Sequence, residues 1–151
     1  MLPVLFCGII AFDQLIKFLV VHHMTPGESI PVFAPFFHIT FILNAGAAFG
    51  MLERAQIFFI FAGALVLVLF LFFRSHLKKE PRSFFYGAHF MIAGAVGNLI
   101  DRIRIGRVID YLDFHIWPVF NLADMVIVFG VALMIYSMCF DSREKAHKEA
   151  R

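Results

Sequence analysis

Hydrophobic residues along the chain fall into four long runs, and shorter segments rich in polar residues, glycine and proline separate them. The runs cover approximately residues 2–21, 55–73, 84–102 and 120–140. A helix needs about 20 apolar residues to cross a hydrocarbon core about 30 Å thick, and each run approaches that length. We therefore expect four transmembrane helices within one membrane-embedded domain that spans residues 1–151.

The segment between the first two runs, approximately residues 25–50, has a different pattern. Three prolines and a glycine exclude a long helix there, namely Pro26, Gly27, Pro31 and Pro35. Between Phe37 and Leu43, large apolar residues occupy alternate positions, which is typical of a strand with one apolar face. We expect this β-element to lie at the membrane surface. The loop 44–50 follows, and two interpretations of it stay open. Its glycines allow a bound chain to approach the backbone closely, or the loop is a simple tight connection.

Composition places the chain in the membrane. Hydrophobic residues make up 61% of the chain, which includes 21 Phe, and only 16% of its residues are charged. That balance leaves too little polar surface to cover a water-soluble globule. The net charge of +2 and the scattered basic residues argue against a nucleic-acid partner. The predicted fold class is an all-α membrane protein with four transmembrane helices and a small extracytoplasmic β-element between the first and second helices, surrounded by membrane lipid.

Basic residues follow the second and fourth runs, which end on the same side of a four-span protein. Four follow the second run (Arg74, Lys78, Lys79, Arg82) and four follow the fourth (Arg143, Lys145, Lys148, Arg151). Because Lys and Arg are enriched in cytoplasmic loops, we expect both termini in the cytoplasm. The β-element and the connection between the third and fourth runs then lie on the extracytoplasmic side.

The first run contains two charges that are costly inside a membrane. Asp13 and Lys17 are four residues apart, so they share one helix face and can form an ion pair. Two interpretations stay open, a structural pair buried in the helical bundle and a pair that supports a polar site on neighbouring helices.

Four aspartates lie between Gly97 and Asp124, at the junction of the third and fourth runs, namely Asp101, Asp110, Asp113 and Asp124. Two carboxylates held close together share a proton, so one can accept a proton from water while the other polarises a carbonyl group. Asp124, just inside the fourth run, could meet an aspartate of the preceding connection at the outer membrane surface. Alternatively, the first three aspartates only neutralise Arg102, Arg104 and Arg107.

The sequence lacks the motifs of other kinds of hydrolytic enzyme. The chain has no H-E-x-x-H for a zinc site and no G-x-S-x-G around a serine nucleophile. His89 in the third run has no second His or Cys at ligand spacing, so we expect a hydrogen-bonded histidine within the bundle. We expect no metal and no cofactor.

Five short motifs follow one another along the four runs. They are DQLIK at 13–17, NAGAAFG at 44–50, GNLIDR at 97–102, VIDY at 108–111 and FNLAD at 120–124. In this order and placement they resemble the prokaryotic lipoprotein signal peptidases, also called signal peptidase II, over nearly the whole chain. The resemblance implies that Asp110 and Asp124 form the catalytic pair of an aspartic endopeptidase.

The resemblance also implies a set of residues that line or brace the substrate site, namely Asn44, Gly46, Asn98, Asp101, Arg102 and Asn121. The implied substrate is a prolipoprotein that carries diacylglycerol on its lipobox cysteine and is cut just before that cysteine. The implied location is the bacterial cytoplasmic membrane, with the site near the extracytoplasmic face, and we expect a monomer.

Two alternatives from other classes stay open. A proton-coupled transporter could use an intramembrane relay of Asp13, Lys17, His89 and Asp124. A non-catalytic membrane subunit would use the same charges only to select its helix partners.

Overall fold

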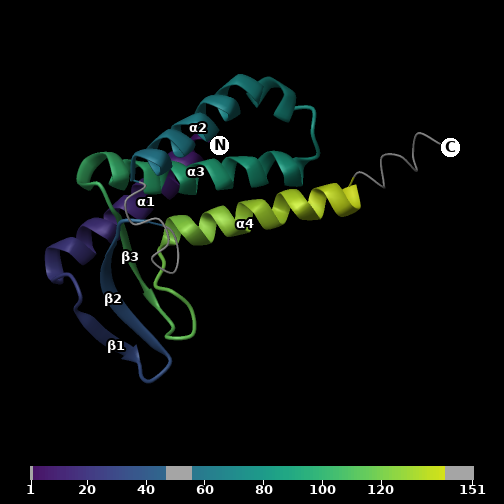
Figure 1. Ribbon diagram of the computed structural model, residues 1–151. Coiled ribbons are helices and arrows are strands. Elements are labelled where there is room, and N and C mark those ends of the chain that lie inside the picture. Colours follow the sequence, from purple (N-terminus) through teal and green to yellow (C-terminus); the bar gives the residue numbers. More distant parts are fainter. Residues whose placement is uncertain (1, 47–55, 142–151) are drawn as a thin grey trace.

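The computed structural model describes residues 2–46 and 56–141. Its helices are α1 (Leu2–His23), α2 (Gln56–Leu77), α3 (Arg82–Ile105) and α4 (Leu122–Tyr136), and a π-helical turn, Ser137–Asp141, continues α4 (Figure 1). Within the described residues, four helices are long and apolar enough to cross a membrane. The predicted fold class is therefore confirmed.

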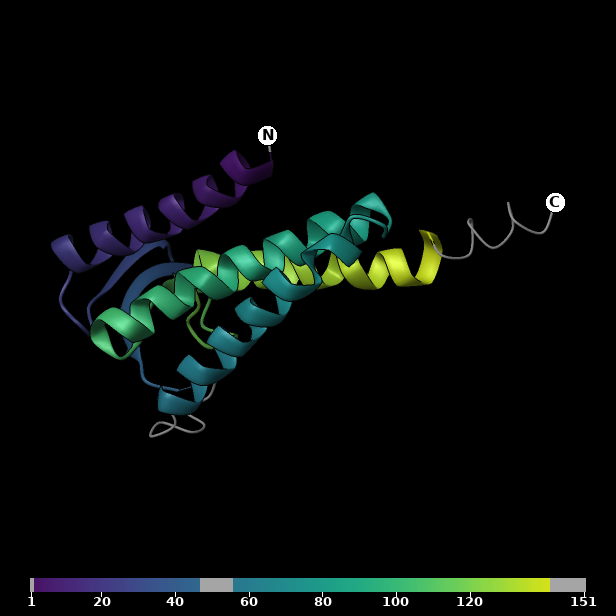
Figure 2. The same cartoon turned by 90° about the horizontal axis from the view of Figure 1, so that it is seen from above.

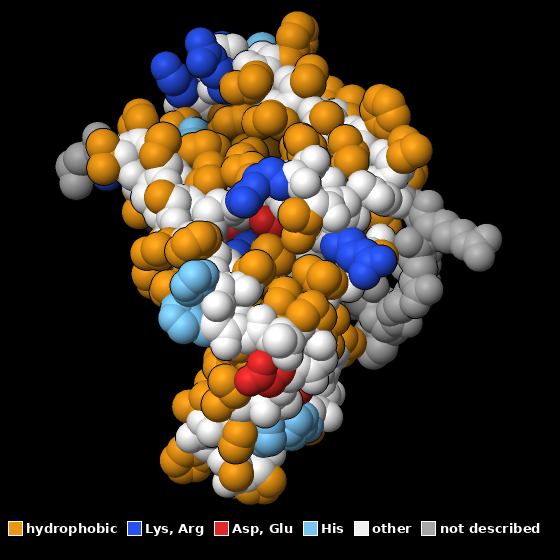
Figure 3. Space-filling view, turned by 90° about the vertical axis from the view of Figure 1, so that its left-hand side faces the viewer, with side chains coloured by type: hydrophobic (Ala, Val, Ile, Leu, Met, Phe, Trp, Pro, Cys, Tyr) orange, Lys and Arg blue, Asp and Glu red, His pale blue; other side chains and the backbone are white. Residues whose placement is uncertain are grey.

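Helix α3 is the centre of the bundle. It contacts α1, α2 and α4, and Figure 2 shows α1 and α2 on either side of it. Buried positions of α3 include small residues such as Gly87, Ala88, Ala93 and Gly94, which let neighbouring helices approach closely. Helix α2 has no buried residue and consists mostly of hydrophobic side chains, so its surface is suited to lipid. Figure 3 looks at the end of the molecule where the sheet lies, and there Lys and Arg side chains interrupt the hydrophobic ones near the centre of the face.

Helices α3 and α4 approach each other closely enough for backbone contact. A Cβ atom added to Gly130 of α4 would lie 2.5 Å from the Gly87 carbonyl oxygen and 2.5 Å from the Met91 nitrogen, both on α3. Such distances are well inside van der Waals contact. The glycines of the two helices are therefore required by the packing.

Three antiparallel strands form a sheet beside the bundle. They are β1 (Ser29–Phe33), β2 (Phe37–Asn44) and β3 (Val108–Asp113), in the order β1-β2-β3. In the register of β2 and β3, Asn44 is opposite Val108 and Ile42 is opposite Asp110. Since side chains two residues apart share a face of a sheet, Asn44 can reach Asp110 diagonally.

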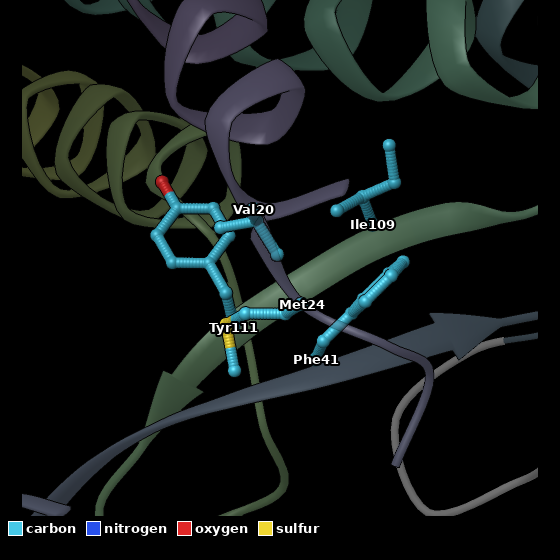
Figure 4. Packing of buried hydrophobic residues seen from close by; sticks show 5 residues of the cluster. All are labelled: Val20, Met24, Phe41, Ile109 and Tyr111. Atoms are coloured by element: carbon cyan, nitrogen blue, oxygen red, sulfur yellow. The ribbon is translucent and has the colours of Figure 1, made fainter. Parts of the chain in front are cut away.

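A hydrophobic cluster attaches the sheet to α1. Val20 of α1 and Met24, which directly follows α1, pack against Phe41 of β2 and against Ile109 and Tyr111 of β3 (Figure 4). All five side chains are buried. This cluster fixes β3, and hence Asp110, relative to the bundle.

The predicted β-element is present, but its extent was underestimated. Strand β1 contains Pro31, which is tolerated because β1 is an edge strand. Strand β3 comes from the connection between α3 and α4, for which we predicted no strand. Most of the loop 44–50 lies outside the described residues.

The predicted helix bounds also need correction. Helix α2 continues to Leu77, so Arg74 belongs to its last turn and not to a basic loop. A long basic side chain at a helix end can extend to the headgroup region, so its charge does not end the helix. Helix α4 begins at Leu122, which places Asp124 in its first turn instead of one turn inside.

The contact between α3 and α4 predicts that Gly130→Ala destabilises the protein. The added methyl group must displace backbone, and we expect the free energy of unfolding to fall by about 1–3 kcal/mol. Gly8→Ala is the matched control, because a Cβ at Gly8 meets nothing within 4 Å. Thermal unfolding in detergent measures both variants. Equal midpoints for the two would contradict the close packing.

Candidate active site

Polar residues from the sheet, α3 and α4 converge on a cavity of about 210 Å³. Six of the residues that we expected in the site line it, namely Asn44, Gly46, Asn98, Arg102, Asp110 and Asp124. The rest of the lining is mostly apolar and includes Trp117, Pro118 and Phe120. Asp101 and Asn121 do not line the cavity and are buried beside it, with 1% and 0% exposure. The cavity lining therefore combines two carboxylates and other polar groups with apolar side chains.

Asp110 occupies the middle of β3 and is almost fully buried. Its two oxygens accept different hydrogen bonds, one from Asn44 Nδ2 at 2.8 Å and one from Asn121 Nδ2 at 2.6 Å. Burial raises the pKa of Asp110 from 3.8 to about 7, and the nearby charge of Asp124 acts in the same direction. The hydrogen bonds from the two asparagines oppose this rise. Asp110 can therefore hold a proton near neutral pH.

Asp124 is held at the start of α4 by a reciprocal cap. The side chain of Asn121 accepts a hydrogen bond from the Asp124 backbone nitrogen at 3.0 Å, and Asp124 Oδ2 accepts one from the Asn121 nitrogen at 3.2 Å. This capping box starts the helix and favours a carboxylate at the positive end of its dipole. The other oxygen of Asp124 accepts from Asn98 Nδ2 at 2.7 Å. Both carboxylate oxygens are thus fixed.

Two asparagines connect the carboxylates. Asn121 Nδ2 donates to Asp110 and, at 3.1 Å, to Asn98 Oδ1. Asn98 in turn donates to Asp124. The sequence of bonds from Asp110 through Asn121 and Asn98 to Asp124 holds two acidic groups against one cavity, because neither amide can rotate without breaking a bond to a carboxylate.

The Lys17 ammonium group of α1 supports these hydrogen bonds through its contact with Asn98. It lies 2.9 Å from Asp13 Oδ2, 2.7 Å from Asp101 Oδ2 and 2.9 Å from Asn98 Oδ1. An ammonium group has three protons, so these three acceptors use its full donor capacity. Lys17 is 1% exposed. The pair of Asp13 and Lys17 is thus buried in the bundle and also contacts a residue of the cavity.

The carboxylates around Lys17 extend the network to two further elements. Asp13 Oδ1 accepts from the Ala123 backbone nitrogen at 3.0 Å, in the first turn of α4. Asp101 Oδ2 accepts from the Ile109 nitrogen at 3.3 Å, in β3. These bonds place the elements that carry Asp124 and Asp110.

Asp113 belongs to a different cluster. It accepts from the Thr40 hydroxyl at 2.7 Å and from the His115 nitrogen at 2.9 Å, and the His115 ring lies 3.0 Å away. Burial alone would raise the pKa of Asp113, but these hydrogen bonds and the charges of His115 and His38 outweigh it and lower the pKa below 3.8. Asp113 is not among the cavity-lining residues.

The arginines are not the partners that the local sequence suggested. Asp101 pairs with Lys17, while the Arg102 guanidinium lies 5.0 Å from the centre of the Phe59 ring and lines the cavity. One Arg102 nitrogen is also 3.5 Å from the Asn98 carbonyl oxygen. This placement leaves the guanidinium beside the cavity and beside both proposed acidic groups.

Two residues that we did not select from the sequence also brace the site. Tyr111 Oη accepts from the Leu122 nitrogen at 3.2 Å, and burial raises the pKa of this tyrosine to about 12. Gln14 Nε2 donates to Asp101 Oδ1 at 3.0 Å and to the Gly97 carbonyl oxygen at 3.1 Å. Both lie inside quoted motifs, and a glutamine within a membrane span is itself a signal.

His89 is separate from this network. Its Nδ1 is 2.7 Å from the Phe85 carbonyl oxygen, one turn earlier in α3, and its ring contacts Phe70 and Phe85. In the part of the chain that the structure describes, these contacts give His89 no link to Asp124 for a proton relay. Within residues 2–46 and 56–141, no group of three His, Cys, Asp or Glu side chains is placed to hold a metal ion.

Comparisons with known proteins agree on one family. Residues 5–140 match the family model described as signal peptidase (SPase) II. The lipoprotein signal peptidase of Moorella thermoacetica is 41% identical over 140 residues, which cover 93% of each chain. That of Halothermothrix orenii is 46% identical over 127 residues, 84% of this chain and 87% of the relative. A solved bacterial membrane enzyme structure superposes with a TM-score of 0.85 at 30% identity, covering 95% of this chain and 90% of that one.

The Lys17 network predicts that Lys17→Met is strongly destabilising. It would leave the buried carboxylates of Asp13 and Asp101 without their cation, and we expect a loss of about 3–5 kcal/mol in the free energy of unfolding. Lys79→Met is the control, since Lys79 is exposed. Thermal or denaturant unfolding in detergent compares the two. A Lys17→Met protein as stable as the Lys79→Met protein would show that the network does not hold the fold.

Proposed function

Because the chain belongs to the signal peptidase II family, a family of membrane proteases, we propose that it removes signal peptides from prolipoproteins with Asp110 and Asp124 as an aspartic catalytic pair. The observation that supports this most is the convergence of the carboxyl groups of buried Asp110 and half-buried Asp124 on one cavity. The bonds through Asn98 and Asn121 hold them there.

The proposed chemistry needs one protonated and one ionised carboxyl group. A pKa of about 7 lets Asp110 keep a proton while the pair as a whole carries one negative charge. The ionised group accepts a proton from a water molecule, the resulting hydroxide adds to the scissile carbonyl carbon, and the protonated group gives its proton to the carbonyl oxygen. Collapse of this intermediate breaks the C–N bond and transfers a proton to the leaving amine. Neither a metal nor a covalent enzyme intermediate is required.

The proposed substrate carries diacylglycerol on its lipobox cysteine and is cut just before that cysteine. The cavity lies where the sheet meets the ends of α3 and α4, so the acyl chains of such a substrate can stay in the hydrocarbon region while its peptide reaches the carboxylates. Arg102 presents several donors beside the cavity and is suited to the peptide carbonyls of the substrate. Asn44 both lines the cavity and orients Asp110.

We place this site at the extracytoplasmic face of the bacterial cytoplasmic membrane, with both termini in the cytoplasm. The basic residues near the connection between α2 and α3 support this orientation, because positive charges accumulate on the cytoplasmic side. The sheet lies at the other end of α3 (Figure 1), and the α3 residues that line the cavity, Asn98 and Arg102, belong to that end.

The proposal predicts that Asp110→Asn and Asp124→Asn each reduce kcat by about 10²–10⁴-fold, because an amide can neither accept the proton of water nor donate one from an acid. The measurement is cleavage of a purified, diacylglyceryl-modified precursor by the purified protein in detergent or lipid discs. Thermal unfolding establishes that each variant is folded.

Asp113→Asn is the matched control for both variants. Asp113 lies on the same strand as Asp110 and is also buried, but its partners are Thr40 and His115. We expect near wild-type cleavage from it. A folded Asp110→Asn or Asp124→Asn protein that cleaves at the wild-type rate would exclude the proposed pair. Ion transport without proteolysis by the wild type would instead favour a transporter.

A further inference from the structure

A second and larger cavity, about 640 Å³, lies between α1, α2 and α3. Its residues on α3, Phe85, His89 and Val96, all precede Asn98, the first α3 residue of the candidate active site. The cavity therefore lies on the part of α3 that is nearer the connection to α2, whereas the sheet lies at the other end of α3 (Figures 1 and 2). A cavity of this volume is in the range of sites that bind small amphiphilic molecules.

The wall that α2 contributes is one stripe of the helix. Leu67, Phe70, Leu71 and Arg74 occupy positions i, i+3, i+4 and i+7 of α2, so they share a face, and Lys78 directly follows the last residue of the helix. Leu67, Phe70 and Leu71 are apolar, and the other two residues are cations four positions apart in the sequence. The cavity is thus apolar along most of its length and basic at one end.

The opposite wall is aromatic. The His89 ring lies 4.9 Å from that of Phe70 and 4.3 Å from that of Phe85 between ring centres, so the histidine joins α2 to α3. Since a carbonyl oxygen only accepts hydrogen bonds, His89 Nδ1 is the donor in its hydrogen bond to the Phe85 carbonyl. Pro3 and Phe6 of α1 complete the lining. No carboxylate occurs among the lining residues that the structure describes, so nothing there neutralises the two cations.

The length of the stripe matches one leaflet of a bilayer. Lys78 follows Leu67 by eleven residues, which correspond to about 16 Å along a helix. Half of a hydrocarbon core about 30 Å thick is nearly the same distance. An acyl chain in this cavity would therefore place its headgroup at the level of Arg74 and Lys78.

We propose that this cavity is a binding site for a phospholipid with an anionic headgroup, whose acyl chain lies against Phe70 and Phe85 and whose phosphate lies between Arg74 and Lys78. The two cations at the basic end of the cavity favour an anionic headgroup over a zwitterionic one. It also disfavours the signal-peptide helix of a substrate, whose N-terminal region is itself positively charged. The site is separate from the cavity that contains Asp110 and Asp124, and the proposal does not depend on their role.

Quenching by brominated lipids tests the proposal directly. The chain has one tryptophan, Trp117, in the other cavity, so a Trp117→Phe, Phe70→Trp protein carries a single indole in the proposed site. In phosphatidylcholine discs we expect brominated phosphatidylglycerol to quench it with at least about fivefold higher affinity than brominated phosphatidylcholine, since one basic residue near a membrane surface contributes about that factor. Adding Arg74→Gln and Lys78→Gln should abolish the preference.

Lys79→Gln on the same background is the control, because Lys79 is next to Lys78 and does not line the cavity. It should keep the preference for phosphatidylglycerol. Equal quenching by the two lipids, no quenching by either, or loss of the preference in the Lys79→Gln protein would overturn the proposal. Native mass spectrometry of the unsubstituted chain gives a second measurement, in which phosphatidylglycerol should remain bound at collision energies that remove phosphatidylcholine. Removal of both lipids at the same collision energy would also overturn it.

Discussion

The buried ammonium group of Lys17 is the interaction on which the rest of the site depends. A lone charge in a membrane span is costly, and this one is compensated by two carboxylates and an amide oxygen. Each of these acceptors has a second bond, through which Asp13 fixes the start of α4 and Asp101 fixes β3. Three helices and the sheet are thereby positioned around one cation.

The candidate active site uses this frame to hold two acidic groups that would otherwise repel each other. Asn98 contacts both Lys17 and Asp124, and Asn121 both caps α4 and contacts Asp110. The residue that begins the helix is therefore also the residue that orients the opposite carboxyl group. Local helix formation and site geometry are coupled, so Asp124 cannot move without loss of the cap.

The spans could be predicted from the sequence because bilayer thickness sets the length of each apolar run. Strand β3 could not, since its six residues lie in a connection between two spans and its buried face is not visible as a simple alternation. The partner of Asp101 could not be predicted from the sequence either. Arg102, Arg104 and Arg107 are its neighbours in sequence, whereas Lys17, 84 residues away, is its neighbour in space.

The family motifs identified residues that the fold brings together, but not how they interact. Asp110 and Asp113 lie three residues apart on β3 and have opposite pKa shifts. Only their three-dimensional surroundings distinguish them. Asp110 is buried beside Asp124, whereas Asp113 accepts hydrogen bonds from Thr40 and His115. The catalytic role of the pair Asp110 and Asp124 is our proposal on this basis.

The most direct test of that proposal is an infrared pH titration of the purified protein, which detects the C=O stretch of a protonated carboxylic acid. A raised pKa means that Asp110 stays protonated to higher pH, so the band should disappear with a midpoint near pH 7 and should be absent from an Asp110→Asn protein. It should remain in Asp113→Asn, because the lowered pKa of Asp113 leaves that group ionised. If no band titrates near pH 7, or if a band with that midpoint survives Asp110→Asn, the result would contradict a shared proton at this pair.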